Sequence, residues 1–182
     1  MRTVTYGGAC SLDGFITGPN ESVDWLTWSD DVGAIVKAFW ESIDTLLMGR
    51  KTWEFAQRQA GPAEGAAMTG MHSYVFSRTL RAIDQPGVTL VSDGAEDVVK
   101  RLKKSPGKGI CVFGGGELAR SLFEADLIDE VGFNIQPVLL GSGTPGFRDA
   151  KHRIDLDLAE CRQLAKGCVY VRYRVKHKRR RR

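Results

Sequence analysis

The chain has 182 residues, of which 42% are hydrophobic and 26% charged, and this indicates one globular domain with its own core. No apolar run approaches the roughly 20 residues of a membrane span and no secretory signal opens the chain, so we expect a cytoplasmic protein. The net charge of +4 depends on the last seven residues, which carry six positive charges, because elsewhere 20 basic side chains face 22 acidic ones.

The first third of the chain predicts a strand, a long loop and an amphipathic helix. Residues 3–9 are rich in β-forming and small residues, and glycine and proline punctuate the loop that follows. The helix is expected to begin at Ser29, which can cap it, while Asp30 and Asp31 suit its positive end. Apolar side chains then recur at helical spacing up to Ile43, so this helix packs one face on a sheet.

The middle of the chain alternates predicted strands and helices. Strands are expected at residues 45–48, 74–76, 88–91 and 109–113, short helices at 50–57 and around 118–123, and a surface loop at 59–70. Another helix is expected to start at Asp93, an acidic cap with a glutamate three residues on, and to stop at Ser105-Pro106-Gly107. Its Val98 and Val99 face inward, whereas Lys103 is expected to face solvent or the negative end of the helix.

The last third of the chain has a different pattern. Residues 127–140 hold two apolar segments around Pro137, and residues 168–175 alternate as a half-buried strand does, antiparallel to its neighbours. Strand and helix alternation followed by antiparallel strands predicts an α/β fold with a central, mostly parallel mixed sheet. Residues 1–175 would form this domain. Residues 176–182 would form a basic, disordered tail, whose contact with nucleic acid stays open as an alternative.

Candidate chemistry lies where strands meet helices, because ligands of an open α/β sheet bind beyond the carboxyl ends of its strands. At Gly114-Gly115-Gly116 a strand runs into glycines and then a helix, whose free N–H groups can hold a pyrophosphate. The same glycines also fit a simple tight turn. The four cysteines and three histidines lack the spacing of a zinc site, so no metal is expected.

Two other strand ends supply polar groups. Arg50 and Lys51 stand at a helix start, where cations are disfavoured by about 0.3–1 kcal/mol, and this favours an anionic ligand over a solvated charge pair. Thr52 beside them can donate a hydroxyl hydrogen bond to a phosphate oxygen. Ser77 and Arg78 follow another strand and can hold a 2′-phosphate, which would select NADPH over NADH, although a plain surface arginine is an equal interpretation.

These strings resemble, in order, those of the dihydrofolate-reductase-like family, in the branch related to the C-terminal reductase domain of the bifunctional riboflavin-biosynthesis deaminase-reductase. The resemblance is carried by residues 9–16, 47–53, 74–78, 112–118 and 137–141. It implies a three-layer fold with helices on both faces of the sheet, and a homodimer. It also implies hydride transfer from NADPH to a C=N-type centre of a small substrate, such as 5-amino-6-(5-phosphoribosylamino)uracil.

The resemblance further assigns the cofactor site. The residues that would bind NADPH are Ala9, Ile16, Gly49, Arg50, Lys51, Thr52, Ser77, Arg78, Gly114, Gly115, Gly116, Glu117 and Leu118. In such reductases the peptide between the first two glycines is often cis, and the loop with Trp25 would act as a mobile lid over the substrate. Asp13 matches a residue of the riboflavin-type reductases, although Asp13-Gly14 is also a simple turn.

The candidate catalytic acids are Asp30 and Asp31, near the place where dihydrofolate reductases have their acidic substrate-binding residue. Their spacing to Met48-Gly49-Arg50 does not align with a folate site, and both fit equally as acids at a helix start. A dihydrofolate reductase and a non-catalytic binding or regulatory module therefore stay open beside the riboflavin-type reductase.

Overall fold

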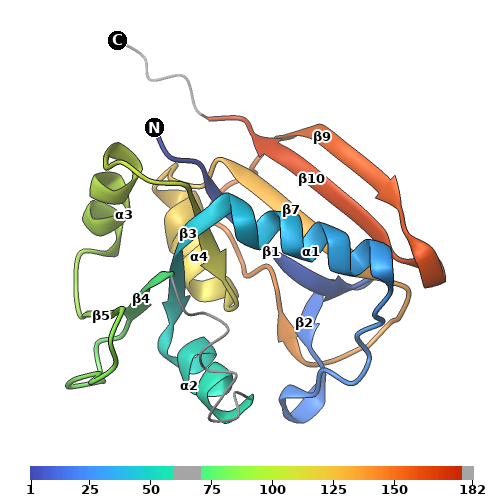
Figure 1. Cartoon of the computed structure of the whole chain (residues 1–182), viewed down its shortest axis with the longest axis horizontal. Coiled ribbons are helices and arrows are strands. Elements are labelled where there is room, and N and C mark those ends of the chain that lie inside the picture. Colours follow the sequence, from blue (N-terminus) through green and yellow to red (C-terminus); the bar gives the residue numbers. More distant parts are fainter. Residues whose placement is uncertain (60–70, 178–182) are drawn as a thin grey trace.

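A twisted sheet of eight strands runs through the middle of the protein (Figure 1). The computed structural model describes residues 1–59 and 71–177. The strands are β1 (Val4–Ser11), β3 (Ile43–Gly49), β4 (His72–Phe76), β5 (Val88–Val91), β6 (Gly109–Phe113), β7 (Glu130–Gln136), β9 (Leu156–Gln163) and β10 (Val169–Val175). Their order in space is β5-β4-β3-β6-β1-β7-β10-β9. A small second sheet pairs β2 (Phe15–Thr17) with β8 (Thr144–Pro145).

The first six strands of this order are parallel to one another, and β10 is antiparallel to both of its neighbours, β7 and β9. This confirms the predicted mixed sheet with antiparallel C-terminal strands. The helices are α1 (Asp30–Ser42), α2 (Arg50–Gln59), α3 (Ala95–Lys104) and α4 (Gly116–Glu124), with short 3-10 turns at Pro19–Glu21 and Ala165–Gly167. In Figure 1, α1 crosses the near face of the sheet and α4 lies behind it.

Two hydrophobic clusters hold these layers together. On one face Val99 of α3 and Leu122 of α4 pack with Tyr6 of β1 and Val112 of β6, all buried. On the other face the tryptophans of α1 and α2 pack against the cluster around Met48 of β3. Helices therefore cover both faces of the sheet, which confirms the three-layer architecture.

Several local predictions about helix ends were wrong. Ser29 precedes α1 but makes no capping bond, because its hydroxyl donates to the Asp31 carboxylate instead. Asp93 does not cap α3, since Gly94 takes the capping position in a left-handed conformation (φ 68°). The two short strands of the second sheet, β2 and β8, were not predicted.

Lys103 is buried rather than facing solvent. Its ammonium group donates to both oxygens of Asp129, at 2.6 and 2.7 Å, and to the carbonyl of Leu127 at 3.0 Å. Asp129 also accepts a hydrogen bond from the N–H of Val4 at 2.8 Å. The pair therefore joins α3, β1 and the segment before β7, and its two members are 26 residues apart in the chain.

The start of the predicted tail also lies against the fold. Lys176 pairs with Asp157 at 2.6 Å, and the His177 ring contacts Asp126 and Asp129. Residues 178–182 lie outside the described part of the chain, as do residues 60–70 of the predicted loop. A disordered tail and its contact with nucleic acid thus stay predictions.

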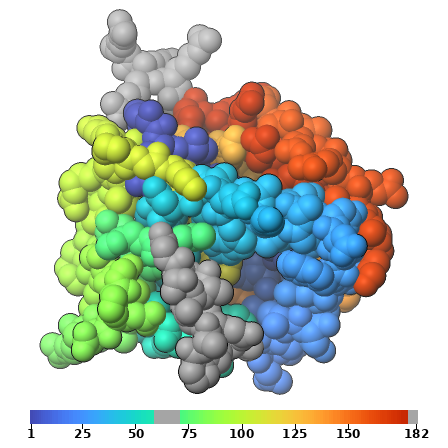
Figure 2. Space-filling view, viewed as in Figure 1, coloured from blue at the N-terminus to red at the C-terminus, as the bar shows by residue number. Residues whose placement is uncertain are grey.

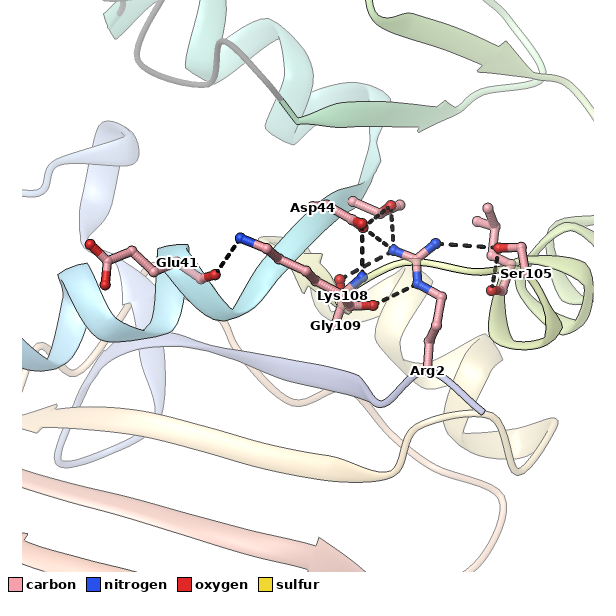
Figure 3. Close-up of polar contacts among 8 residues, drawn as sticks. Arg2, Glu41, Asp44, Ser105, Lys108 and Gly109 are labelled. Carbon is pink, nitrogen blue, oxygen red and sulfur yellow. Dashed lines mark hydrogen bonds and ion pairs between the residues drawn. The ribbon is translucent and has the colours of Figure 1, made fainter.

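A buried arginine fastens the amino ends of the central strands (Figure 3). Arg2 donates to the carbonyl of Lys108 at 2.6 Å and to the Thr45 hydroxyl at 2.7 Å, and it pairs with the Asp44 carboxylate. Asp44 also accepts the N–H of Lys108 at 2.8 Å. The beginnings of β1, β3 and β6 are thereby joined at the edge of the sheet opposite their carboxyl ends.

We predict that Asp44 stabilises the fold in a pH-dependent way. Burial alone would raise the pKa of Asp44, but hydrogen bonds from Lys108 and Thr45 and the charge of Arg2 outweigh it and lower the pKa. Since the lowered pKa belongs to the folded state, this stability is present at neutral pH and is lost as the pH falls below about 4.

Urea denaturation of Asp44→Asn tests this. The free energy of unfolding should fall by about 1–3 kcal/mol at pH 7, and the gap to the wild type should narrow below about pH 4. Replacement of the exposed Asp149 by asparagine is the matched control and should change little. A gap that is constant from pH 7 to pH 3 would contradict the role of the Asp44 charge.

Candidate functional site

The three predicted loops lie side by side at the carboxyl edge of the sheet. The chain passes from β3 directly into α2 at Gly49 and Arg50, and from β6 through Gly114 and Gly115 into α4. Ser77 directly follows β4. Because β4, β3 and β6 are neighbours in the sheet, their carboxyl ends form one continuous rim where an open α/β sheet binds ligands.

Thr52 joins two of these loops. Its hydroxyl oxygen accepts a hydrogen bond from the N–H of Gly115 at 3.2 Å. Gly114 has a positive φ of 83°, and a side chain added there would lie 2.4 Å from the Thr52 side chain. Two separate constraints therefore require glycine at this position: its backbone conformation and the close approach of Thr52. The accepting hydroxyl keeps its own hydrogen, so it can still donate to a ligand.

The peptide between Gly114 and Gly115 is trans, in contrast to the cis bond that the resemblance suggested. After it, Gly116 is buried against the carbonyl oxygen of Gly146, which lies 2.8 Å from where a β-carbon would be. Glu117 is exposed in the first turn of α4, while Leu118 and Ile16 pack against the core. A segment far along the chain thus closes one side of the glycine loop.

The predicted cations differ in their surroundings. Arg50 pairs with Glu54 one turn further along α2, at 2.8 Å, so its charge is partly balanced within the helix. Lys51 and Arg78 are exposed. Ser77 is buried, and its hydroxyl oxygen accepts hydrogen bonds from the backbone N–H groups of the next turn, at 3.0 and 3.2 Å. Ser77 therefore shapes the turn that presents Arg78.

The carboxylate of Asp31, a candidate catalytic acid, is used in hydrogen bonds that hold the fold together. Hydrogen bonds from the Ser29 hydroxyl and the N–H of Ala165 hold the pKa of Asp31 below its usual range. The bond from Ala165 is 2.7 Å long and ties the start of α1 to the turn between β9 and β10. An acid that is held ionised is a poor proton donor at neutral pH. Asp30 is exposed at the start of the same helix.

Asp13 and Trp25 also make structural contacts. The Asp13 carboxylate accepts from the Ser11 hydroxyl at 2.6 Å and from the N–H of Gly141 at 2.8 Å, and these bonds lower its pKa. It thus braces the turn after β1 against the loop after β7. Trp25 donates its indole N–H to the carbonyl of Ser22 at 3.0 Å, within its own loop.

The loop of Trp25 is fastened near the end of β7. The N–H of Thr27 donates to the side-chain carbonyl of Gln136 at 2.8 Å, and Lys166 donates to the carbonyl of Trp28 at 2.9 Å. In Figure 2, α1 (light blue) lies between this segment (blue) and the C-terminal strands (orange to red).

The sequence analysis missed two buried carboxamides on β7, those of Asn134 and Gln136. The signal was present, because these polar residues alternate with the apolar residues Phe133 and Ile135, as they do on a strand with two different faces. Reading residues 127–140 only as apolar segments concealed it.

The described residues contain neither a candidate metal site nor a helix that could span a membrane. They contain no group of three or more histidine, cysteine, aspartate or glutamate side chains arranged to hold a metal ion. Among residues 1–59 and 71–177, no helix has the length and apolar character needed to cross a membrane.

We predict that Gly114→Ala destabilises the protein by about 2–3 kcal/mol in urea denaturation, through a left-handed backbone conformation and the contact with Thr52. Gly115→Ala is the matched control in the same loop. Its φ is −45°, and the nearest atom to its new side chain would be the Thr52 hydroxyl at 3.7 Å. Equal losses of stability in both variants would refute the specific requirement at Gly114.

Known proteins share this fold over nearly the whole chain. A putative riboflavin biosynthesis protein from Shewanella sp. PV-4 has a TM-score of 0.83 and 23% identity, covering 97% of this chain and all of that one. A Thermotoga maritima diaminohydroxyphosphoribosylaminopyrimidine deaminase/5-amino-6-(5-phosphoribosylamino)uracil reductase has a TM-score of 0.71 and 16% identity, over 96% of this chain and 57% of its own. Dihydrofolate reductase from Enterococcus faecalis, complexed with NADP(H), has a TM-score of 0.66 and 15% identity, with 96% of each chain covered.

These likenesses confirm the dihydrofolate-reductase-like fold. The sequence gives a finer assignment. The Bacillus subtilis (strain 168) protein YyaP is 38% identical in an alignment of 181 positions that covers 95% of each chain. A family model described as the RibD C-terminal domain matches residues 2–170. The chain therefore belongs to the RibD C-terminal domain family.

Proposed function

We propose that this protein is an NADPH-dependent reductase of the riboflavin-biosynthesis type, which transfers hydride to a small heterocyclic substrate resembling 5-amino-6-(5-phosphoribosylamino)uracil. The observation that carries the proposal is the rim formed by three adjacent loops, in which Thr52 is hydrogen-bonded to Gly115. Family membership and the reductase and NADP(H) named for proteins of the same fold support it.

The backbone of the rim has room for such a cofactor. A side chain added at Gly49 would meet no atom within 4 Å, so the backbone there is open to a ligand. Gly115, the N-cap of α4, has no capping side chain, which leaves the first N–H groups of that helix for a phosphate. In this proposal the glycine loop and α4 hold the pyrophosphate, with Arg50 and Lys51 beside it. Arg78 binds the 2′-phosphate.

NADPH would supply the hydride, and the chain would bind and orient the cofactor. Ala9, at the carboxyl end of the central strand β1, and Ile16 would flank the nicotinamide. The proton that must accompany the hydride would come from water, because Asp31 is held ionised by Ser29 and Ala165. The same hydrogen bonds disfavour a folate site at Asp31, since its carboxylate already accepts from Ser29 and Ala165 and is not free to bind a pterin.

We predict that Arg78→Ala weakens NADPH binding about 10-fold and leaves NADH binding unchanged, because only NADPH carries the 2′-phosphate. Arg50→Ala should weaken both cofactors, since the pyrophosphate is common to them. Fluorescence titration of the apo protein measures each Kd, with Arg101→Ala on α3 as the control. No saturable NADPH binding below millimolar concentration would refute the proposed function, and an equal loss for both cofactors would refute the role of Arg78.

The homodimer remains a prediction, and we propose β9 as its interface. This strand forms one edge of the sheet, nearly all of its residues are exposed, and Leu158 is 60% exposed. A long exposed edge strand with apolar side chains is a template for pairing with another strand. Leu158→Lys should therefore shift the mass measured by light scattering from dimer to monomer. A monomeric wild type, or a dimeric variant, would contradict this interface.

A further inference from the structure

Asn134 has an unsatisfied carboxamide in the interior of the protein. The residue is 8% exposed, and its side-chain carbonyl oxygen is shielded from solvent without a hydrogen-bond partner among the described residues. Gln136, two residues further along β7, has a buried carboxamide whose oxygen is hydrogen-bonded, as is usual for such groups. Its side-chain oxygen accepts from the N–H of Thr27 and from the thiol of Cys168. Because buried acceptors are nearly always paired, the free oxygen of Asn134 needs an explanation.

The carboxamide of Asn134 lies on the α1 face of the sheet, over small residues. Asn134 pairs in register with Ala9 of β1 and Tyr170 of β10, so these three side chains share a face. Tyr170 packs against the cluster around Val32 of α1, which identifies that face. The next pair on this face toward the amino ends of β1 and β7 is Gly7 and Gly132, which carry no side chains. The Tyr170 hydroxyl lies 3.5 Å from where a β-carbon on Gly132 would be.

This place lies next to the proposed cofactor rim but on the other side of β1. The rim is formed by the ends of β4, β3 and β6, and β7 follows β1 in the order of the sheet. Ala9, the residue expected beside the nicotinamide, lies between them. A molecule bound over Ala9 would therefore have the cofactor on one side and the carboxamide of Asn134 on the other.

The chemistry of Asn134 specifies what it can bind. A carboxamide is neutral and offers an acceptor and donors side by side, which match an adjacent N–H and C=O on a ring. The carboxylate of Asp31, which could select a protonated ring instead, is occupied by the N–H of Ala165. We propose that Asn134 is a specificity-determining residue that pairs with the amide edge of a neutral heterocyclic substrate. This inference rests on the proposed reductase function.

The first test separates recognition from structure. Asn134→Leu keeps the number and branching of the side-chain heavy atoms and removes an acceptor that has no partner, so its urea midpoint should be equal to or above that of the wild type. Gln136→Leu is the matched control, and its urea midpoint should fall, because the N–H of Thr27 then loses its hydrogen-bond acceptor. A loss of stability in Asn134→Leu as large as in Gln136→Leu would overturn the proposal, since Asn134 would then be structural.

The second test uses two probes on the NADPH-loaded protein, followed by tryptophan fluorescence. The first probe is 5,6-diaminouracil, and the second is its 1,3-dimethyl derivative, which has no ring N–H. The wild type should bind the first at least 10-fold more tightly, and Asn134→Leu should lose this preference while its Kd for NADPH stays unchanged. Absent preference in the wild type, preserved preference in the variant, or failure to bind either probe at millimolar concentration would overturn the proposal.

The NADPH titration keeps the two proposals apart. Failure of the wild type to bind NADPH would refute the reductase function itself. Normal NADPH binding combined with a failed probe test would refute only the role of Asn134. A weaker Kd for NADPH in Asn134→Leu would place the carboxamide against the nicotinamide and also overturn the inference.

Discussion

The hydrogen bond between the N–H of Gly115 and the Thr52 hydroxyl holds together the two loops on which the candidate cofactor site depends. It couples α2 to α4 across the ends of β3 and β6, strands that are already paired in the sheet. The opposite edge of the sheet is fixed by charge, through Arg2 with Asp44 and Lys103 with Asp129. Buried charges are therefore paired at the amino edge, while at the carboxyl edge Lys51 and Arg78 are exposed where an anionic ligand would bind.

The strands and helices follow from local patterns, and these were predictable. The strand at 88–91 and the one at 109–113 have the predicted bounds, because each is an apolar segment bounded by residues that disfavour strands. Helix ends were less predictable, because several side chains can compete for one backbone group. Asp93 and Ser29 have typical capping chemistry, yet a left-handed Gly94 and the carboxylate of Asp31 determine the actual geometry. Lys103 could not be placed from its neighbours, since its partner Asp129 lies 26 residues away.

One half of the candidate site could be predicted from the sequence, and the other half could not. Its cofactor half was predictable because glycines and cations at strand ends are local features of the sequence, and the fold places those ends together. Its substrate half depends on which side chains share a face of the sheet after folding. Ala9 and Asn134 are far apart in the sequence and come into register only through the pairing of β1 with β7. Asp31, conversely, has the right residue type for catalysis but is committed to Ala165 by a contact that only the tertiary structure reveals.

The segment before α1 and the first turn of α1 are connected to distant parts of the protein at three points. Thr27 is bonded to β7, Trp28 to Lys166, and Asp31 to Ala165, so two of the three bonds reach the turn between β9 and β10. This segment cannot swing outward as an isolated flap without breaking those bonds or carrying the hairpin with it. Any movement of this segment is therefore mechanically linked to the hairpin of β9 and β10, and a second copy bound at β9 would restrain it.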